Sequence, residues 1–131
     1  MILLDTHVLA RLVFEPKKLS RPATRAIERA ARSGGIGIAS ITVWELACLF
    51  ARGRIRHPGT VDAAVARVVR ESRVVVREIT PVVAALAVQF PANFPGDPAD
   101  RLIAATARAE GIPLVTADER IRECPLVETV W

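Results

Sequence analysis

The amino-acid sequence predicts an α/β domain with a central parallel sheet and helices on both of its faces. Short apolar runs alternate along the chain with longer segments of helical periodicity, which is the pattern of repeated strand–helix–strand units. The chain has 131 residues, 51% of them hydrophobic, which suffices for one domain with a buried core. Because no linker, repeat or low-complexity stretch interrupts the pattern, residues 1–131 are expected to form a single domain.

The first half of the chain alternates strands and helices. The apolar run MILL is typical of a buried strand that ends at Asp5. Ser20 and Pro22 suit the start of a helix, and the pair Gly34-Gly35 suits its end. The expected elements are a strand over 1–4, a helix over 6–14, a helix over 20–34, a strand over 35–40, and a helix that Ser40 or Thr42 caps and that ends near Gly53.

The second half repeats this alternation after a basic turn, RIRHPG. Thr80 followed by Pro81 is a good helix start, and the loop PANFPG separates that helix from the next. The expected elements are a helix over 60–72, a strand over 74–79, a helix over 80–89, a helix over 98–110, a strand over 113–116 and a last short strand, LVETV.

The charge balance is basic, and arginine dominates it. Lys and Arg number 18 against 14 acidic residues, and 16 of the 18 are Arg. Arginine suits planar, bidentate binding of phosphate, so a nucleic-acid partner is one interpretation. The other is a GC-rich coding sequence, and composition does not choose between the two.

Composition also excludes several classes of protein. Charged residues interrupt every apolar run before the roughly 18 residues of a membrane span. The N-terminal segment carries no basic region ahead of its apolar run, unlike a secretory signal. Two cysteines, Cys48 and Cys124, form neither a disulfide framework nor a zinc spacing. A reduced, cytoplasmic protein without a membrane segment is expected.

Two aspartates follow predicted strands. Asp5 comes directly after MILL, and Asp118 comes two residues after the strand within IPLVTA. In an open parallel sheet, ligands bind outside the carboxyl ends of the strands, where both carboxylates are expected. Aspartate at a strand-to-helix turn is also an ordinary helix cap, so each residue on its own has two interpretations.

The stretch GDPADRLIAATA places two more aspartates at the start of a helix. Asp97 before Pro98 suits an N-cap, and Asp100 in the first turn suits the helix dipole. Asp100, however, shares its helical stripe with apolar residues, namely Ile103, Ala104 and Ala107. A purely solvated acid would more naturally share a stripe with Arg101 and Arg108, so this segment alone leaves both interpretations of Asp100 open.

Glu45 poses the same choice in the segment SITVWELACLF. It lies on a stripe with Ile41, Cys48 and Leu49, and it also completes a possible capping box with Thr42. Carboxylates gathered on such faces repel one another, and a divalent cation removes that cost. Oxygen ligands without Cys or His favour Mg²⁺ or Mn²⁺ over zinc.

Three segments, in chain order, resemble the PIN domain: LLDTHVLARL, SITVWELA and GDPADRLIAATARAEGIPLVTADE. More narrowly, they resemble the VapC-type ribonuclease toxins of type II toxin–antitoxin (VapBC) pairs, and the ending VTADERIRECPLVETVW is similar to the same group. The resemblance implies a three-layer α/β/α sandwich whose acidic pocket binds Mg²⁺ or Mn²⁺ and hydrolyses RNA. It also implies a homodimer and a cognate antitoxin.

The resemblance assigns roles to particular residues. It implies the catalytic acids Asp5, Glu45, Asp100 and Asp118, of which Asp5, Asp100 and Asp118 would hold the metal. It implies accessory roles for Asp97, Thr6 and Thr116. His7 departs from the family pattern, in which Asn is the commoner residue at this position, and it is not expected to ligate metal.

The basic stretch Arg52, Arg54, Arg56 and His57 has two interpretations, an RNA contact beside the pocket or a solvated helix end. The few aromatic residues give no sign of a base-stacking platform, and Trp44 is expected in the core or in a partner interface. Two rival functions remain open: a catalytically silent PIN-like domain that only binds RNA or protein, and a phosphatase or DNA nuclease that uses the same site.

Overall fold

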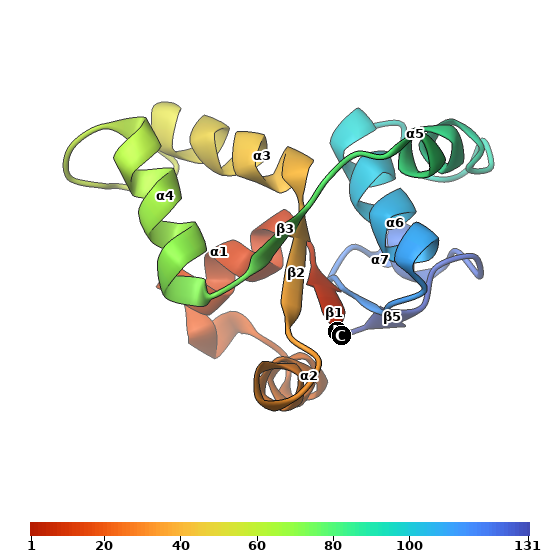
Figure 1. The fold of residues 1–131 in the computed structure, drawn as a ribbon, viewed down its shortest axis with the longest axis horizontal. Helices are drawn as coiled ribbons and strands as arrows, with labels where there is room; N and C mark the ends of the chain where they lie inside the picture. The colour runs from red at the N-terminus through yellow and green to blue at the C-terminus, as the bar shows by residue number, and fades with distance from the viewer.

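The computed structural model describes all 131 residues, and it confirms the α/β fold class (Figure 1). A five-stranded sheet lies between two groups of helices. In chain order the elements are β1 (Ile2–Leu4), α1 (Thr6–Phe14), the 3₁₀ helix η1 (Pro16–Lys18), α2 (Arg21–Arg32), β2 (Ile36–Ala39), α3 (Ser40–Ala51), α4 (Val61–Ser72), β3 (Val75–Arg77), α5 (Pro81–Val88), α6 (Pro98–Glu110), β4 (Leu114–Val115), α7 (Glu119–Arg122) and β5 (Thr129–Val130).

All strand pairs are parallel, and the strand order is β3-β2-β1-β4-β5. Leu4 of β1 is in register with Ile38 of β2 on one side and with Val115 of β4 on the other. The chain first builds outward from β1 to β3 and then returns to the opposite side of β1. The order therefore reverses between β1 and β4, which is where open α/β sheets bind ligands.

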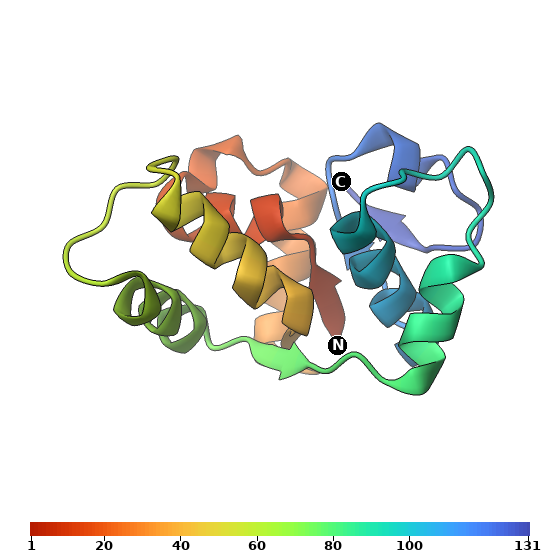
Figure 2. The ribbon, with the colours of Figure 1, turned by 90° about the horizontal axis from the view of Figure 1, so that it is seen from above.

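Alternate residues of β1 pack on opposite faces of the sheet, as the two-residue period of a strand requires. Ile2 and Leu4 belong to the core cluster that α1, α2, α3 and α4 cover. Leu3 belongs to the second cluster, which α5, α6 and α7 cover. Seen from above, α3 and α6 lie on either side of β1 (Figure 2), so they flank the end of the strand that leads into Asp5.

The structure differs from the expected elements at their ends. The segment LVETV forms only the two-residue strand β5, because a turn with a hydrogen bond from Val127 N to the Cys124 carbonyl takes up its first half. The helices η1 and α7 are too short to show a periodicity and were not expected. Ala39, not Ser40 or Thr42, is the N-cap of α3, because β2 runs into that helix without a turn. None of the helices combines the length and the hydrophobicity that crossing a membrane requires.

Leu46 in α3 tests the core that supports the sheet. Its side chain is fully buried in the first core cluster, so Leu46→Ala should lower the free energy of unfolding by about 2–5 kcal/mol. Val88 at the end of α5 is highly exposed, and Val88→Ala should change it by less than about 0.5 kcal/mol. Chemical denaturation measures both, and equal effects would contradict the packing described here.

Candidate active site

The carboxylate of Asp5 lies at the carboxyl end of β1, where the strand order reverses. The residue is 3% exposed, and its side chain caps α1 by accepting a hydrogen bond from the Thr6 amide at Oδ1 over 2.7 Å. Its Oδ2 atom accepts a second hydrogen bond, from the Thr116 hydroxyl, over 2.6 Å. A buried carboxylate costs free energy unless such donors surround it, so these two contacts hold the group in place.

Thr116 connects Asp5 to Asp118. Its buried hydroxyl donates to Asp5 and accepts a hydrogen bond from the Asp118 amide over 3.1 Å. Asp118 caps the short helix α7 through one oxygen, Oδ1, which accepts from the Arg120 and Ile121 amides. The other oxygen of Asp118 has no hydrogen-bond partner in the protein.

His7, in the first turn of α1, contacts both Asp5 and the segment after β4. Its Nε2 atom accepts a hydrogen bond from the Ala117 amide over 3.3 Å, and its Nδ1 atom lies 3.4 Å from Asp5 Oδ2. This hydrogen-bond pattern assigns the ring proton to Nδ1, which faces the carboxylate. His7 thus braces Asp5 against the loop that carries Asp118, through a contact that the sequence alone did not reveal.

Glu45 approaches from α3 on the opposite side of the site. Its Oε1 atom accepts a hydrogen bond of 2.5 Å from the Thr6 hydroxyl, which also lies 3.0 Å from the hydroxyl of the buried Thr42. Burial raises the pKa of Glu45, and the charges of Asp5 and Asp97 raise it further, while the bond to Thr6 lowers it. Glu45 therefore faces the site, and the possible capping box with Thr42 does not form.

Thr42 is a site residue that sequence reasoning assigned only to helix capping. It precedes Glu45 by three residues, so both lie on one face of α3. That spacing was the signal available, but it fits a capping box equally well. Only the position of Thr6, from another helix, shows that the hydroxyl of Thr42 contributes to the site.

The start of α6 contributes the remaining two acids. Asp97 caps the helix by accepting from the Ala99 amide over 2.8 Å. Asp100 lies in the first turn and is half-buried. Burial raises the pKa of Asp100 to about 7, and the charges of Asp97, Asp5, Asp118 and Glu45 contribute in decreasing order. Asp97 is thus a cap, and Asp100 is a carboxyl group placed in the field of the other acids.

These acids share a cleft of about 520 Å³ that α1, α3 and the start of α6 enclose. The lining residues are Asp5, Thr6, His7, Ile41, Trp44, Glu45, Cys48, Leu49, Arg52, Asp97, Pro98, Ala99 and Asp100. Asp118 does not line the cleft but lies close enough to raise the pKa of Asp100. The cleft therefore presents oxygen ligands and negative charge, which suit a cation.

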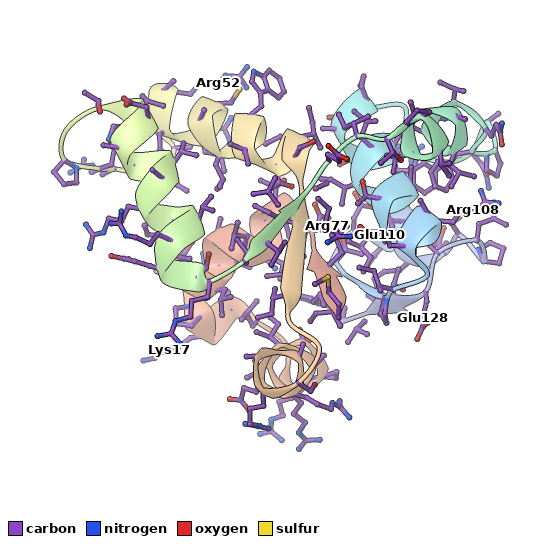
Figure 3. The ribbon with its side chains drawn as sticks, viewed as in Figure 1. Lys17, Arg52, Arg77, Arg108, Glu110 and Glu128 are labelled. Atoms are coloured by element: carbon purple, nitrogen blue, oxygen red, sulfur yellow. The ribbon has the colours of Figure 1, made fainter.

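The structure separates the three arginines of the predicted RNA contact. Arg52 is the C-cap of α3 and lines the acidic cleft, and it lies on the outer side of the helix in Figure 3. Arg56 lines a different cavity together with His57. Arg54 is exposed in the loop between them. Trp44, expected in the core or an interface, is 59% exposed and so is not part of the core.

The carboxylate oxygens of the cleft suit a divalent ion chemically. All of the acids offer only oxygen, the ligand that Mg²⁺ and Mn²⁺ prefer, and their mutual repulsion at Asp100 is of the kind that a cation relieves. No three acidic, His or Cys side chains are arranged to ligate the same ion in this conformation.

The fold and the site together define an α/β protein with an acidic cleft at the switch point of a parallel sheet. The family model of the PIN domain matches residues 2–125, and the chain belongs to the PIN-domain family. Over 132 residues it is 44% identical to the protein named Ribonuclease VapC22 from Mycobacterium tuberculosis (strain ATCC 25618 / H37Rv), covering 99% of this chain and 98% of that protein.

Solved structures show the same fold. VapBC2 from Rickettsia felis, bound to a DNA fragment from their promoter, matches with a TM-score of 0.74 at 18% identity, covering 98% of this chain and 97% of that chain. DNA-bound VapBC from Salmonella typhimurium matches with a TM-score of 0.65 at 26% identity, with the same two coverages. The resemblance noted in the sequence to VapC-type members of the PIN family is thereby confirmed.

The raised pKa of Asp100 predicts how stability depends on pH. The pKa is about 7 in the folded chain against an ordinary 3.8, so between these values the folded chain holds a proton that the unfolded chain releases. The free energy of unfolding therefore falls as pH rises from about 4 to about 7. Asp100→Asn should flatten this slope and stabilise the protein at pH 8, as measured by thermal denaturation with a chelator present.

Asp62 supplies the matched control for this experiment. It is exposed, and the hydroxyl of Thr60 lowers its pKa, so its contribution to stability is lost only as pH falls below about 4. Asp62→Asn should therefore leave the slope between pH 4 and 7 unchanged. A parental slope in Asp100→Asn would show that neither burial nor the neighbouring acids raise the pKa of Asp100 in the folded chain.

Proposed function

We propose that this protein is an Mg²⁺- or Mn²⁺-dependent endoribonuclease that hydrolyses RNA phosphodiester bonds and acts as the toxin of a type II (VapBC) toxin–antitoxin pair. The observation that carries the proposal is the convergence of Asp5, Glu45, Asp97 and Asp100 on one cleft, in a chain 44% identical to a protein named as a ribonuclease. The mutual repulsion of these acids favours a bound cation.

The charge distribution supports an anionic substrate. Outside Asp5, Glu45, Asp97, Asp100 and Asp118, the 18 basic side chains of the protein stand against nine acidic ones. A strongly basic body attracts a polyanion, whereas an acidic cleft without a cation would repel the phosphate to be cleaved. Both features are reconciled when the cleft is neutralised by a divalent ion.

Each acid has a place in this proposal. Asp5, Asp100 and Asp118 would hold the ion, and the free oxygen of Asp118 would turn toward the cleft. A bound divalent ion would supply Lewis-acid polarisation of the scissile phosphate and of the attacking water.

Glu45, with one oxygen held by the Thr6 hydroxyl, keeps its second oxygen available to orient the attacking water. Thr116 holds Asp5 and the Asp118 loop together. In-line attack on the phosphate then breaks the bond to the leaving oxygen.

Substitution of single carboxylates tests the activity. Asp5→Asn and Asp100→Asn should each lower RNA cleavage on the order of 100-fold or more, the scale of losing one electrostatic group at a transition state. Asp62→Asn, at an exposed acid outside the cleft, should cleave like the parent. The assay measures cleavage of total cellular RNA in the presence of Mg²⁺, of Mn²⁺ or of a chelator. Expression of Asp5→Asn or Asp100→Asn should inhibit growth less than expression of the parent or of Asp62→Asn.

The outcomes separate the rival functions. If the parent cleaves no RNA with either ion, the protein is not a metal-dependent ribonuclease. The result would then favour the rival function, a catalytically silent domain that only binds RNA or protein. If DNA or a phosphate monoester is hydrolysed and RNA is not, the site is that of a DNA nuclease or phosphatase. Equal cleavage by Asp5→Asn and the parent would reduce Asp5 to a helix cap.

We also propose that the protein forms a homodimer through an apolar face, defined by Trp44, Val76 and Val82. Val76 lines one cavity with Trp44 and another with Val82, and all three side chains are more than two-fifths exposed. β3 is at the edge of the sheet, so one side of it has no strand partner. An uncovered apolar edge invites pairing, and a two-fold axis would cover it with the same surface of a second copy. The cognate antitoxin would then bind the surface around the acidic cleft.

Charge introduced into the apolar face tests the dimer. The parent should have twice its 14.2 kDa mass in solution, and the double variant Val76→Glu/Val82→Glu should be a monomer, because association would bury the new charges. Val88→Glu, at another exposed valine of α5, should remain a dimer. Light scattering after gel filtration gives the masses, and a monomeric parent would overturn the proposal.

A further inference from the structure

A second cavity, of about 590 Å³, lies at the C-terminal end of α3 and shares no lining residue with the acidic cleft. The end of α1, the loop after α3, and α4 enclose it. We call it the arginine pocket and define it by Phe14, Phe50, His57, Arg56, Arg67 and Arg70. The proposed catalytic roles use none of these residues.

Aromatic rings form one wall of the arginine pocket. Phe50 packs edge-to-face against Phe14, with ring centroids 6.1 Å apart, and against His57, with centroids 5.0 Å apart. Phe50 is buried, whereas Phe14 is 43% exposed. Phe14 therefore offers ring surface on which a flat, apolar group can stack. Local sequence patterns do not predict this platform, because Phe14 precedes Phe50 by 36 residues in the chain.

Positive charge surrounds the aromatic wall. Arg67 is paired with Glu71, the only acidic residue of the lining, at 2.8 Å. Arg56 and Arg70 form no ion pair within the protein. Two exposed guanidinium groups without a carboxylate partner are free to bind phosphate in a bidentate manner.

His57 carries an unsatisfied polar atom in the wall of this pocket. Its Nδ1 is the one buried side-chain nitrogen or oxygen in the protein that has no hydrogen-bond partner. Buried polar atoms are rarely left without a partner. Because protein atoms cover this nitrogen, the His57 ring would have to turn toward the pocket for a base edge or a ribose hydroxyl to supply the missing hydrogen bond.

We infer that the arginine pocket binds a nucleobase of the RNA substrate together with an adjoining phosphate, at a distance from the bond that is cleaved. This inference rests on the proposed function. Helix α3 links the two sites, since Glu45 lies in the cleft and Phe50 in the pocket, about 8 Å apart along the helix axis. Arg52 lies at the end of the same helix on the rim of the cleft, so a strand that runs from one site to the other passes a further cation.

An acidic, apolar peptide is the competing occupant. A single-stranded nucleic acid fits better, because it combines a flat ring with a phosphate at each nucleotide, which matches an open phenyl ring beside unpaired guanidinium groups. In the proposed function, the cleft on the same helix also takes a phosphate-bearing substrate once a divalent ion neutralises its acids. The inference places Arg56, but not Arg54, in contact with RNA.

Binding of a fluorescent single-stranded RNA of mixed sequence, followed by anisotropy, tests the aromatic wall. The protein carries Asp100→Asn so that cleavage does not interfere. Adding Phe14→Leu keeps the apolar volume and removes the ring, and it should weaken binding at least about fivefold, the lower end for loss of one base stack. Phe14→Tyr, which keeps the ring, should bind like the parent.

The arginines are tested in the same assay. Arg56→Gln/Arg70→Gln should weaken binding and make the slope of log affinity against log salt shallower by about 1.4, as expected for two lost phosphate contacts on a single strand. Arg25→Gln/Arg29→Gln removes the same charge from exposed positions on α2 and should change binding less than twofold. Circular dichroism checks that every variant is folded.

Several results would overturn the inference. If the parent cleaves RNA but the pocket variants bind it normally, the pocket is not an RNA site and the proposed function stands. If Arg25→Gln/Arg29→Gln weakens binding as much as the pocket variants do, RNA binding depends only on the net charge of the protein and not on the arginine pocket. If the pocket variants lose an acidic protein partner and keep RNA, the occupant is a peptide. If the parent neither binds nor cleaves RNA, both the inference and the proposed function are wrong.

Discussion

The buried carboxylate of Asp5 is the group on which the rest of the site depends. A charge that is 3% exposed at the end of a central strand is tolerated only where donors converge on it. The Thr6 amide, at the start of α1, and the Thr116 hydroxyl, directly after β4, are those donors. The hydrogen bonds that hold this charge therefore also hold together the two strand ends between which the strand order reverses.

Three of the aspartates are helix caps and members of the acidic site at the same time. Asp5, Asp97 and Asp118 cap α1, α6 and α7, so the amino ends of these helices point toward the site. The positive ends of the helix dipoles partly offset the repulsion between the carboxylates. Asp100 does not cap a helix, and its pKa is the one raised to about 7. The sequence offers two interpretations of each aspartate, a helix cap or a member of the acidic site. The structure shows that one residue can be both.

The face of the sheet beside α6 is braced separately from the active site. Arg77 of β3 and Glu110 of α6 form an ion pair and point toward one another in Figure 3. Arg101 donates hydrogen bonds to the carbonyls of Pro95 and Ala87, which ties the loop before Asp97 to the end of α5. These contacts fix α6, whose first turn carries Asp100, against β3 and the end of α5.

Local patterns in the sequence were enough to determine the alternation of strands and helices, the parallel sheet and the position of Asp5 and Asp118 after strands. Apolar periodicity and caps such as Ser20, Thr60 and Thr80 act over a few residues, so they can be read from the chain. The ends of short elements could not, because η1, α7 and β5 have only two to four residues each, too few for a repeating pattern.

Only the tertiary structure decided which side chains meet. Thr116 reaches Asp5 across 111 positions of the chain, and Thr6 reaches Glu45 across 39. The order of the strands determines these contacts, and no local propensity records them. The same holds for the aromatic wall of Phe14, Phe50 and His57. The sequence by itself determined which residues carry charge and on which face of an element they lie, whereas packing determined which of those faces share a cleft.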